Sequence, residues 1–94
     1  MGKFETGQVV VTAGVAAEME HNPGFIKFIL ESFKRYEICD WGNTCPDDAK
    51  MNDKAVKNGD DHILAAYEDK KCGKIWIITE WDRSVTTILF PSEY

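Results

Sequence analysis

Arginine, histidine and long apolar runs are all scarce in this 94-residue sequence. Arginine occurs only at Arg35 and Arg83, and the formal charge of the chain is −5. Direct binding of nucleic acid needs clustered Lys and Arg to neutralise phosphates, so the composition argues against DNA or RNA as a direct partner. No run reaches the roughly 18 to 20 apolar residues that span a bilayer, and residues 1–8 lack the apolar stretch of a signal peptide. We therefore expect a cytoplasmic protein with no membrane partner.

Cysteine is also scarce, and its number is odd. Small secreted domains are held together by even sets of cysteines, so Cys39, Cys45 and Cys72 are expected to be reduced thiols. Cys39 and Cys45 are separated by five residues, which is wider than the roughly two to four residues between ligands of a zinc knuckle. His21 and His62 stand apart from them. We expect neither a metal site nor a cofactor.

A single domain covering residues 1–94 is the expected organisation. Apolar residues make up 44% of the chain, which supports a packed core and argues against intrinsic disorder. A chain of this length buries roughly 60 to 65% of its unfolded surface, which is enough for one core without covalent staples. The sequence contains no repeat, linker or low-complexity segment that would indicate a second unit.

Residues 74–90 carry the clearest structural signal. Residues 74–81 and 85–90 are both rich in β-branched and aromatic side chains, which favour strands. The intervening Asp82-Arg83-Ser84 supplies turn chemistry, and Pro91 cannot continue a central ladder. The pattern predicts a β-hairpin and therefore a sheet.

Several further segments precede this hairpin. Strands are expected at residues 8–13 and 62–67, and helices at residues 22–37 and 46–58, with a short helical turn at residues 15–20. This order predicts an α+β fold in which two helices cover one face of a small antiparallel sheet. The sheet would consist of the N-terminal strand plus a C-terminal three-stranded meander.

Both faces of the expected strand at residues 74–81 are apolar. Ile75 and Ile77 share one face, whereas Trp76 and Ile78 share the other. Helices that pack on one face leave the second apolar face to be explained. Either another protein covers that face or the sheet is curled.

The densest polar group near aromatic residues lies around the hairpin turn. Its members are Glu80, Asp82, Arg83, Ser84, Thr86 and Thr87. A turn explains Asp82 and Ser84 without any catalytic role, and Arg83 would then sit at an exposed tip. No nucleophile and base are paired by a recognisable spacing, so no catalytic residue is assigned.

Acidic residues gather in the middle third of the chain. Residues 37–69 hold nine acids and three lysines, a net charge of −6, while the remainder nets +1. A surface that imitates DNA phosphates would need carboxylates in unbroken rows. Lysines interrupt the acids on the second helix, and Asp53 with Lys57 forms an ordinary i,i+4 pair. The acids left for an unbroken patch are Glu37, Asp40, Asp60, Asp61, Glu68 and Asp69.

Two tryptophans fall at positions that are usually close to the surface. Trp41 lies in a turn-rich loop at residues 39–44, and Trp81 lies at the end of a strand. Tryptophan is enriched among the residues that dominate protein interfaces, so both are candidate anchors for a partner. The alternative is that each completes the packing of a small core under a loop.

Three segments of the chain carry a resemblance to a known group of proteins. These are FETGQVVVTAGVAAEM at residues 4–19, DWG at residues 40–42 and IWIITEWDRSVTTILFPSEY at residues 75–94. Together they resemble a group of small uncharacterised proteins carried on bacterial plasmids and integrative elements. The resemblance covers nearly the full length and brings no catalytic residues with it. Small acidic proteins of such elements are often accessories that blunt host defence, including inhibitors of CRISPR effectors or restriction enzymes, so the resemblance implies a partner class.

We therefore predict a non-enzymatic binding protein of a mobile genetic element. It would inhibit a host defence nuclease complex, in the manner of an anti-CRISPR protein, by occupying a surface of a host or element-encoded protein. Aromatic side chains would anchor the partner and acids would steer the encounter. The residues expected to contact the partner are Asp40, Trp41, Asp60, Asp61, Trp81, Asp82 and Arg83.

Two other functions remain open. The first is a small enzyme or ligand-binding domain with a cleft near the C-terminal hairpin. The second is a homodimeric interaction module that associates through a free sheet edge or through the second apolar sheet face.

Overall fold

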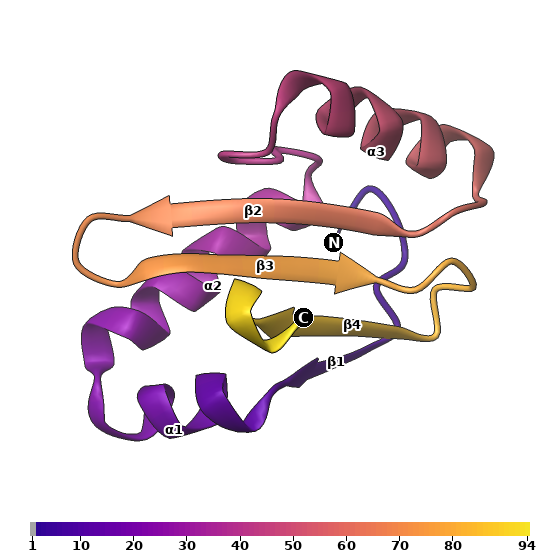
Figure 1. Cartoon of the computed structure of the whole chain (residues 1–94). Helices are drawn as coiled ribbons and strands as arrows, with labels where there is room; N and C mark the ends of the chain where they lie inside the picture. The colour runs from indigo at the N-terminus through magenta and orange to yellow at the C-terminus, as the bar shows by residue number, and fades with distance from the viewer. Residues whose placement is uncertain (1) are drawn as a thin grey trace.

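The computed structural model describes residues 2–94, which form three α-helices, four strands and a short 3₁₀ turn (Figure 1). In chain order the elements are β1 (Gln8–Val11), α1 (Ala13–His21), α2 (Pro23–Glu37), α3 (Pro46–Asn58), β2 (Ile63–Asp69), β3 (Gly73–Thr79), β4 (Val85–Leu89) and η1 (Pro91–Glu93). The α+β fold class expected from the sequence is confirmed. None of the helices in this part of the chain is both long and apolar enough to cross a bilayer.

The four strands form one sheet in the order β1-β4-β3-β2. Strands β2, β3 and β4 are the expected antiparallel meander, with Ile63 opposite Thr79 and Trp76 opposite Leu89. Strand β1 differs from the expectation because it runs parallel to β4. The apolar pattern of a strand marks its faces and not its direction, and the long helical connection after β1 allows a parallel arrangement.

Strand β1 is also shorter than expected. It ends at Val11 because Thr12 caps α1, accepting a hydrogen bond on Oγ1 from the N–H of Val15 at 3.4 Å. Helix α1 therefore begins at Ala13, inside the segment expected to be a strand. The short helical turn expected at residues 15–20 is a full helix, so three helices rather than two pack around the sheet.

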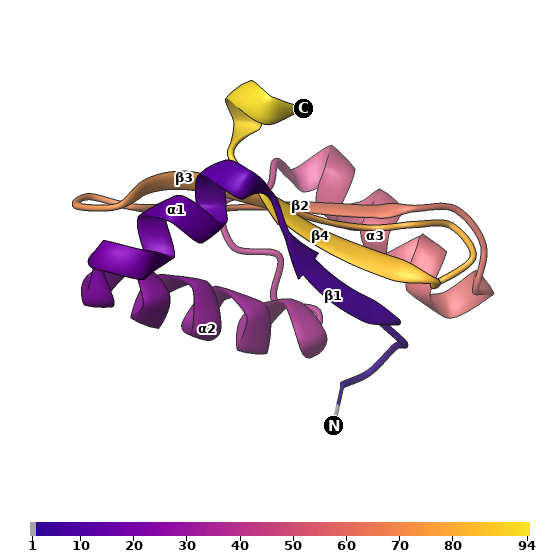
Figure 2. The same ribbon diagram turned by 90° about the horizontal axis from the view of Figure 1, so that it is seen from below.

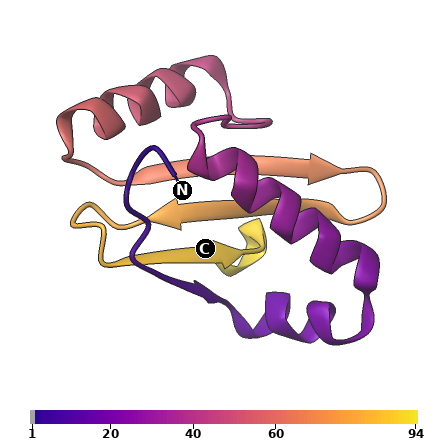
Figure 3. The same ribbon diagram turned by 180° about the vertical axis from the view of Figure 1, so that it is seen from behind.

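Helices α1 and α2 lie on one face of the sheet (Figures 2 and 3). Helix α2 begins where the sequence indicates, because Asn22 accepts from the N–H of Phe25 at 3.1 Å and Pro23 occupies the first turn. Its buried stripe includes Phe25, Ile29 and Tyr36. These side chains meet the inward-facing residues of the sheet in one core cluster, which also contains Val15, Trp41, Ala55, Ile63, Ala65, Tyr67, Ile75, Ile77 and Ile88.

A chain of buried hydroxyl groups crosses this core. Thr86 donates to the carbonyl oxygen of Thr6 at 2.6 Å, and its own hydroxyl oxygen lies 2.7 Å from that of Thr79. Thr79 lies 2.7 Å from the hydroxyl of Tyr36. Because Thr86 has only one hydroxyl proton, Thr79 donates to Thr86 and Tyr36 donates to Thr79. Thr86 and Thr79 are thus structural residues that join the N-terminal segment to α2.

Helix α3 flanks the outer edge of β2 rather than covering a sheet face (Figures 1 and 2). Asn52, a buried residue of α3, donates from Nδ2 to the carbonyl oxygen of Leu64 at 2.8 Å and accepts from the N–H of Leu64 at 3.3 Å. The amide side chain replaces the neighbouring strand that Leu64 lacks. Helix α3 is therefore joined to the sheet edge by a reciprocal pair of hydrogen bonds.

The loop before α3 pairs with the next outward-facing groups of β2. Thr44 accepts on Oγ1 from the N–H of Ala66 at 2.9 Å, and the N–H of Asn43 donates to the carbonyl oxygen of Ala66 at 2.8 Å. The side chain of Asn43 then accepts from the N–H of Glu68 at 2.9 Å. This edge of the sheet is consequently closed to further strands.

In the part of the chain that the structure describes, the second face of the sheet carries no α-helix. Helices α1 and α2 lie on the opposite side, and of residues 2–94 only η1 and the residues around it stand over this face (Figure 2). Trp76 is partly buried there and packs edge to face against Tyr94, with ring centroids 5.4 Å apart. The helices thus leave this second face largely uncovered (Figure 2).

Candidate binding surface at the β3–β4 end of the sheet

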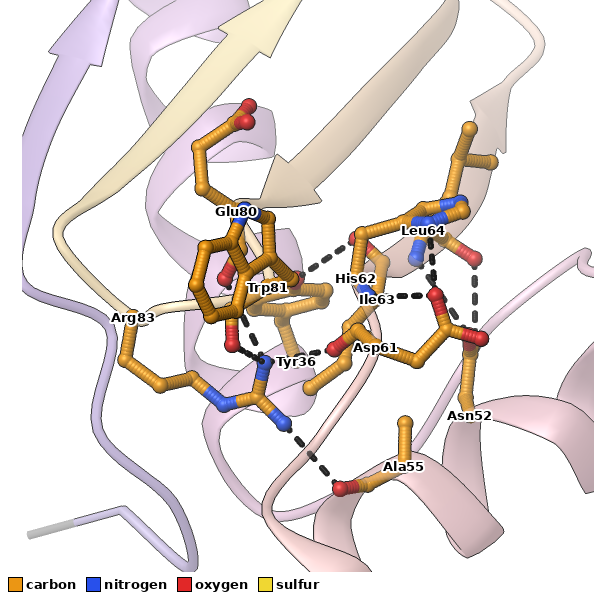
Figure 4. A network of polar contacts seen from close by, with 10 residues as sticks. All are labelled: Tyr36, Asn52, Ala55, Asp61, His62, Ile63, Leu64, Glu80, Trp81 and Arg83. Carbon is orange, nitrogen blue, oxygen red and sulfur yellow. Dashed lines mark hydrogen bonds and ion pairs between the residues drawn. The ribbon is translucent and has the colours of Figure 1, made fainter.

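Five of the seven expected contact residues meet at one end of the molecule. Asp60 and Asp61 connect α3 to β2, whereas Trp81, Asp82 and Arg83 form the turn between β3 and β4. The antiparallel register places the start of β2 beside the end of β3, so these two connections become neighbours. Figure 4 shows Asp61, Trp81 and Arg83 in one network with α3 and β2.

Arg83 is not at an exposed tip, contrary to the expectation from the sequence. Its backbone has a positive φ of 62°, and its guanidinium folds back against neighbouring carbonyl groups (Figure 4). Nη1 donates to the carbonyl oxygen of Asp61 at 2.7 Å, and Nη2 donates to that of Ala55 at 3.0 Å. Weaker bonds from Nη1 reach the carbonyl oxygens of Glu80 and Trp81. Arg83 thus joins the hairpin to the end of α3 and is a structural residue.

Asp82 has the turn role that was the alternative to a catalytic one. Its Oδ1 accepts from the hydroxyl of Ser84 at 2.6 Å and from the N–H of Ser84 at 3.1 Å. Hydrogen bonding by Ser84 lowers the pKa of the Asp82 carboxyl, because it favours the charged form. Asp82 therefore adds a stable negative charge to this end of the protein.

Beside the hairpin, the uncovered sheet face contains a groove of about 660 Å³. Apolar side chains of Ile78 and Leu89 line it, together with the aromatic rings of Trp81 and Tyr94. Trp81 is 67% exposed, so its ring is available to a partner. The sequence-based expectation that Trp81 lies at the surface is confirmed.

The charged residues that line this groove are acidic. Glu80, Asp61 and Glu93 contribute carboxylates, and no Lys or Arg is among the lining residues within positions 2–94. Glu93 accepts from the hydroxyl of Thr12 at 2.7 Å and from the N–H of Phe90 at 2.9 Å, and these hydrogen bonds lower its pKa. The groove therefore combines aromatic surface with negative charge.

Asp61 and His62 form a close pair at the groove. Nδ1 of His62 lies 3.1 Å from Oδ1 of Asp61, which also accepts from the N–H of His62 at 2.8 Å. Both side chains are exposed and line the groove. Sequence reasoning named Asp61 but missed His62, although the adjacency of an acid and a histidine was visible.

Asp40 lies away from this end, beside Arg35. Nε and Nη2 of Arg35 lie 2.8 and 3.1 Å from the two carboxylate oxygens of Asp40, and the N–H of Gly42 donates to the same carboxylate at 3.1 Å. The hydrogen bond from Arg35 is the main cause that lowers the pKa of Asp40. The carboxylate is already paired, so Asp40 does not extend an acidic patch around the groove.

Trp41 belongs to the core, so the expectation that it lies near the surface was wrong. It is only 6% exposed, and its Nε1 donates to Asp53 at 2.8 Å. Its ring packs edge to face on Tyr36, with centroids 5.6 Å apart. A residue with its indole ring and N–H already engaged offers no anchor to a partner in this conformation.

No group of three or more His, Cys, Asp and Glu side chains in the range 2–94 is arranged to hold a metal ion. Cys39, Cys45 and Cys72 are free thiols.

Comparison of the chain with protein-family models, with curated proteins and with solved structures found no match in any of the three.

Proposed function

We propose that this chain is a non-enzymatic binding protein that occupies a basic surface of a partner protein with the groove beside the β3–β4 hairpin. The observation that carries the proposal is the uncovered sheet face, on which an exposed Trp81 stands next to carboxylates and no basic side chain of the described chain lines the groove. A large exposed aromatic is a typical anchor of an interface, and the carboxylates would guide a basic partner toward it.

The partner class that we propose is a host defence nuclease complex. Proteins that bind nucleic acid carry basic grooves for phosphates, and such a groove is complementary to the acidic residues Asp61, Glu80 and Glu93. The resemblance of the sequence to proteins of plasmids and integrative elements supports this class, because inhibitors of CRISPR effectors and restriction enzymes are encoded on such elements. The chain would then block the nuclease by covering its groove.

A capture experiment followed by a cleavage assay tests the proposal. The immobilised protein is incubated with host lysate, the captured nuclease complex is purified, and its DNA cleavage is measured against increasing protein. We expect inhibition, and we expect Trp81→Ala to raise the half-inhibitory concentration at least about tenfold, which corresponds to about 1.4 kcal/mol.

Leu30→Ala is the matched control for Trp81→Ala. Leu30 is also a large exposed apolar side chain, but it lies on α2 and does not line the groove. We expect its half-inhibitory concentration to stay within about twofold of that of the unchanged protein. Equal inhibition by the Trp81→Ala variant, or cleavage that no amount of protein reduces, would contradict the proposed function.

A small enzyme or ligand-binding domain is the second candidate, and the Asp61–His62 pair favours it. A carboxylate that orients an imidazole beside a groove is an arrangement used in acid–base catalysis. The two functions respond differently to His62→Gln, because an enzyme that relied on this imidazole would lose turnover whereas a binding protein would change only its affinity.

A further inference from the structure

The two edges of the sheet are treated differently in this fold. The outer edge of β2 is closed by Asn43, Thr44 and Asn52, whose hydrogen bonds take up successive outward-facing peptide groups. At the other edge, β1 pairs with β4 alone, and no element of residues 2–94 lies beyond it in the sheet (Figures 1 and 3). Strand β1 is therefore the free edge of this sheet.

The peptide groups of β1 alternate between the two sides of the strand. The N–H groups of Gln8 and Thr12 donate to carbonyl oxygens of Ser84 and Ile88, at 3.1 Å in each case, so these residues face β4. Because successive residues point to opposite sides, the N–H and C=O groups of Val9 and Val11 face outward. Two residues with four hydrogen-bonding groups are thus left at the edge.

The usual protections of a free edge are missing from β1. Exposed edge strands commonly carry lysine, proline or a bulge that prevents pairing with another chain. The sequence of β1 is QVVV, with no charge and no proline, and it pairs with β4 in an uninterrupted register. The side chains of Val9 and Val11 are 43% and 36% exposed, which is high for valine in a strand.

We propose that β1 pairs with β1 of a second copy of this chain, antiparallel and centred on Val10. In this register Val9 of each copy lies opposite Val11 of the other, and each pair exchanges two backbone hydrogen bonds. The two four-stranded sheets then join into one continuous sheet. Contact between two identical surfaces related by a two-fold axis is the form of association that closes after two copies.

The backbone on either side of β1 selects this register. Moving the two-fold axis to Val9 would place Val11 opposite Gly7, which has a positive φ of 62° and is not extended. Moving it to Val11 would place Val9 opposite Ala13, the first residue of α1. Only the register centred on Val10 lets extended residues form all four hydrogen bonds.

A second copy suits this edge better than an acidic or basic segment of another protein. The strand is uncharged and the acids of the groove lie on other elements, so two chains of charge −5 can meet at β1 without opposing carboxylates within the strand. Valine opposite valine is also a favourable cross-strand pair. A strand of four residues makes a small interface, so the dimer should be weak and reversible.

Sedimentation equilibrium at protein concentrations up to about 1 mM, where weak association becomes detectable, tests the proposal. We expect the average mass to rise toward twice that of the monomer. Val9→Lys, which places a charge on the pairing edge, should raise the dissociation constant at least about tenfold. Leu30→Lys adds the same charge at an exposed apolar position on α2 and should leave the constant within about twofold. A protein that stays monomeric at about 1 mM, or equal association of the Val9→Lys variant, would overturn the proposal.

Cysteine cross-linking tests the register without relying on the fold of a charged variant. Residues at position 10 of the two copies would form a non-hydrogen-bonded pair with Cα atoms about 4.5 Å apart, a distance that a disulfide spans. Mild oxidation of Val10→Cys should yield a dimer in which peptide mapping finds the link between the two new cysteines. Residues at position 9 would be about 8 Å apart or more, so Val9→Cys should not cross-link. A position-10 link that forms no faster than a position-9 link would also overturn the proposal.

Discussion

Both arginines of the chain are engaged by other groups of the same molecule. Arg35 is held against the carboxylate of Asp40, which raises the pKa of its guanidinium, and Arg83 is held against carbonyl groups of α3 and of the two loops beside it. Lysine is therefore left to supply the freely exposed positive charge. At the same scale, the two candidate tryptophans have opposite roles, since Trp41 is a core residue and Trp81 is exposed.

The pairing of Arg35 with Asp40 predicts a pH effect on stability. The pKa of Asp40 in the folded protein is lowered from its ordinary value of 3.8, so the pair stabilises the fold above about pH 4 and this contribution is lost as the pH falls through the folded pKa. We expect Asp40→Asn to unfold at a lower denaturant concentration at pH 7 and to lose less stability than the unchanged protein between pH 7 and about pH 2. Because the pair is partly exposed, the difference at pH 7 should stay below about 1 kcal/mol.

Urea unfolding at several pH values measures this effect. Asp60→Asn serves as the control, because Asp60 is an exposed residue of the connection between α3 and β2. If the free energy of unfolding changes with pH in the same way for Asp40→Asn and for the unchanged protein across the acid range, the charged pair adds nothing to stability.

At the scale of elements, the position of α3 depends on a few polar contacts with the edge of β2. Most of its side chains are exposed, and its buried residues are Asn52 and Ala55. The Asn52 side chain pairs with Leu64, and the carbonyl of Ala55 accepts from Arg83. The helix is thus fixed at its middle and near its end by hydrogen bonds more than by apolar burial.

Removing the Asn52 side chain should loosen α3 and open the edge of β2. Asn52→Ala deletes both hydrogen bonds and leaves the N–H and C=O of Leu64 without partners, so we expect a loss of about 1 to 3 kcal/mol in the free energy of unfolding. In hydrogen exchange, the amide of Leu64 should lose its protection, whereas that of Ala65, which faces β3, should keep most of it.

Lys50→Ala on the exposed side of the same helix is the control for this measurement. It should leave both the stability and the exchange of Leu64 almost unchanged. Unaltered protection of Leu64 in Asn52→Ala would contradict the role of Asn52 as a substitute for a neighbouring strand.

At the scale of the whole molecule, the layers divide the surface into distinct regions. Helices α1 and α2 cover one sheet face, α3 closes one edge, and the second face with its acidic groove and the β1 edge remain accessible (Figures 1 and 2). The proposed partner surface lies on the second sheet face, and the proposed dimer interface is the outer edge of β1, with Thr12 at the boundary between them. A dimer would therefore present two grooves, which would strengthen binding to a partner with two matching sites.

The net charge of −5 predicts that association with a basic partner depends on salt. Carboxylates around the groove should accelerate the encounter, and screening becomes strong when the Debye length falls from about 30 Å at 0.01 M to about 8 Å at 0.15 M salt. We expect the association rate constant for the captured nuclease complex, measured by stopped flow, to fall about tenfold or more over this range. Glu80→Gln should weaken this dependence more than Glu20→Gln on α1, which does not line the groove. A rate constant that does not change with salt would remove the acidic residues from the mechanism.

The sequence by itself determined the elements whose chemistry is local. Asn22 and Pro23 start α2, Gly59 ends α3 with a positive φ, and the residues from Asp82 to Ser84 turn the hairpin, because caps and turns depend on side chains within a few positions. Alternation in residues 74–81 likewise showed two apolar faces, which the structure has.

Only the tertiary structure decided what depends on distant neighbours. The direction of β1, the burial of Trp41 under α2 and α3, and the return of Arg83 to the carbonyl of Ala55 all join positions far apart in the chain. A local sequence pattern indicates which interactions a residue is able to make. Which of them it makes depends on the distant segments that pack against it in the folded protein. For this reason the apolar second face could be predicted from the sequence. Its groove and the free edge of β1 depend on the tertiary arrangement, in which α1 and α2 lie on one side of the sheet and α3 lies at its far edge.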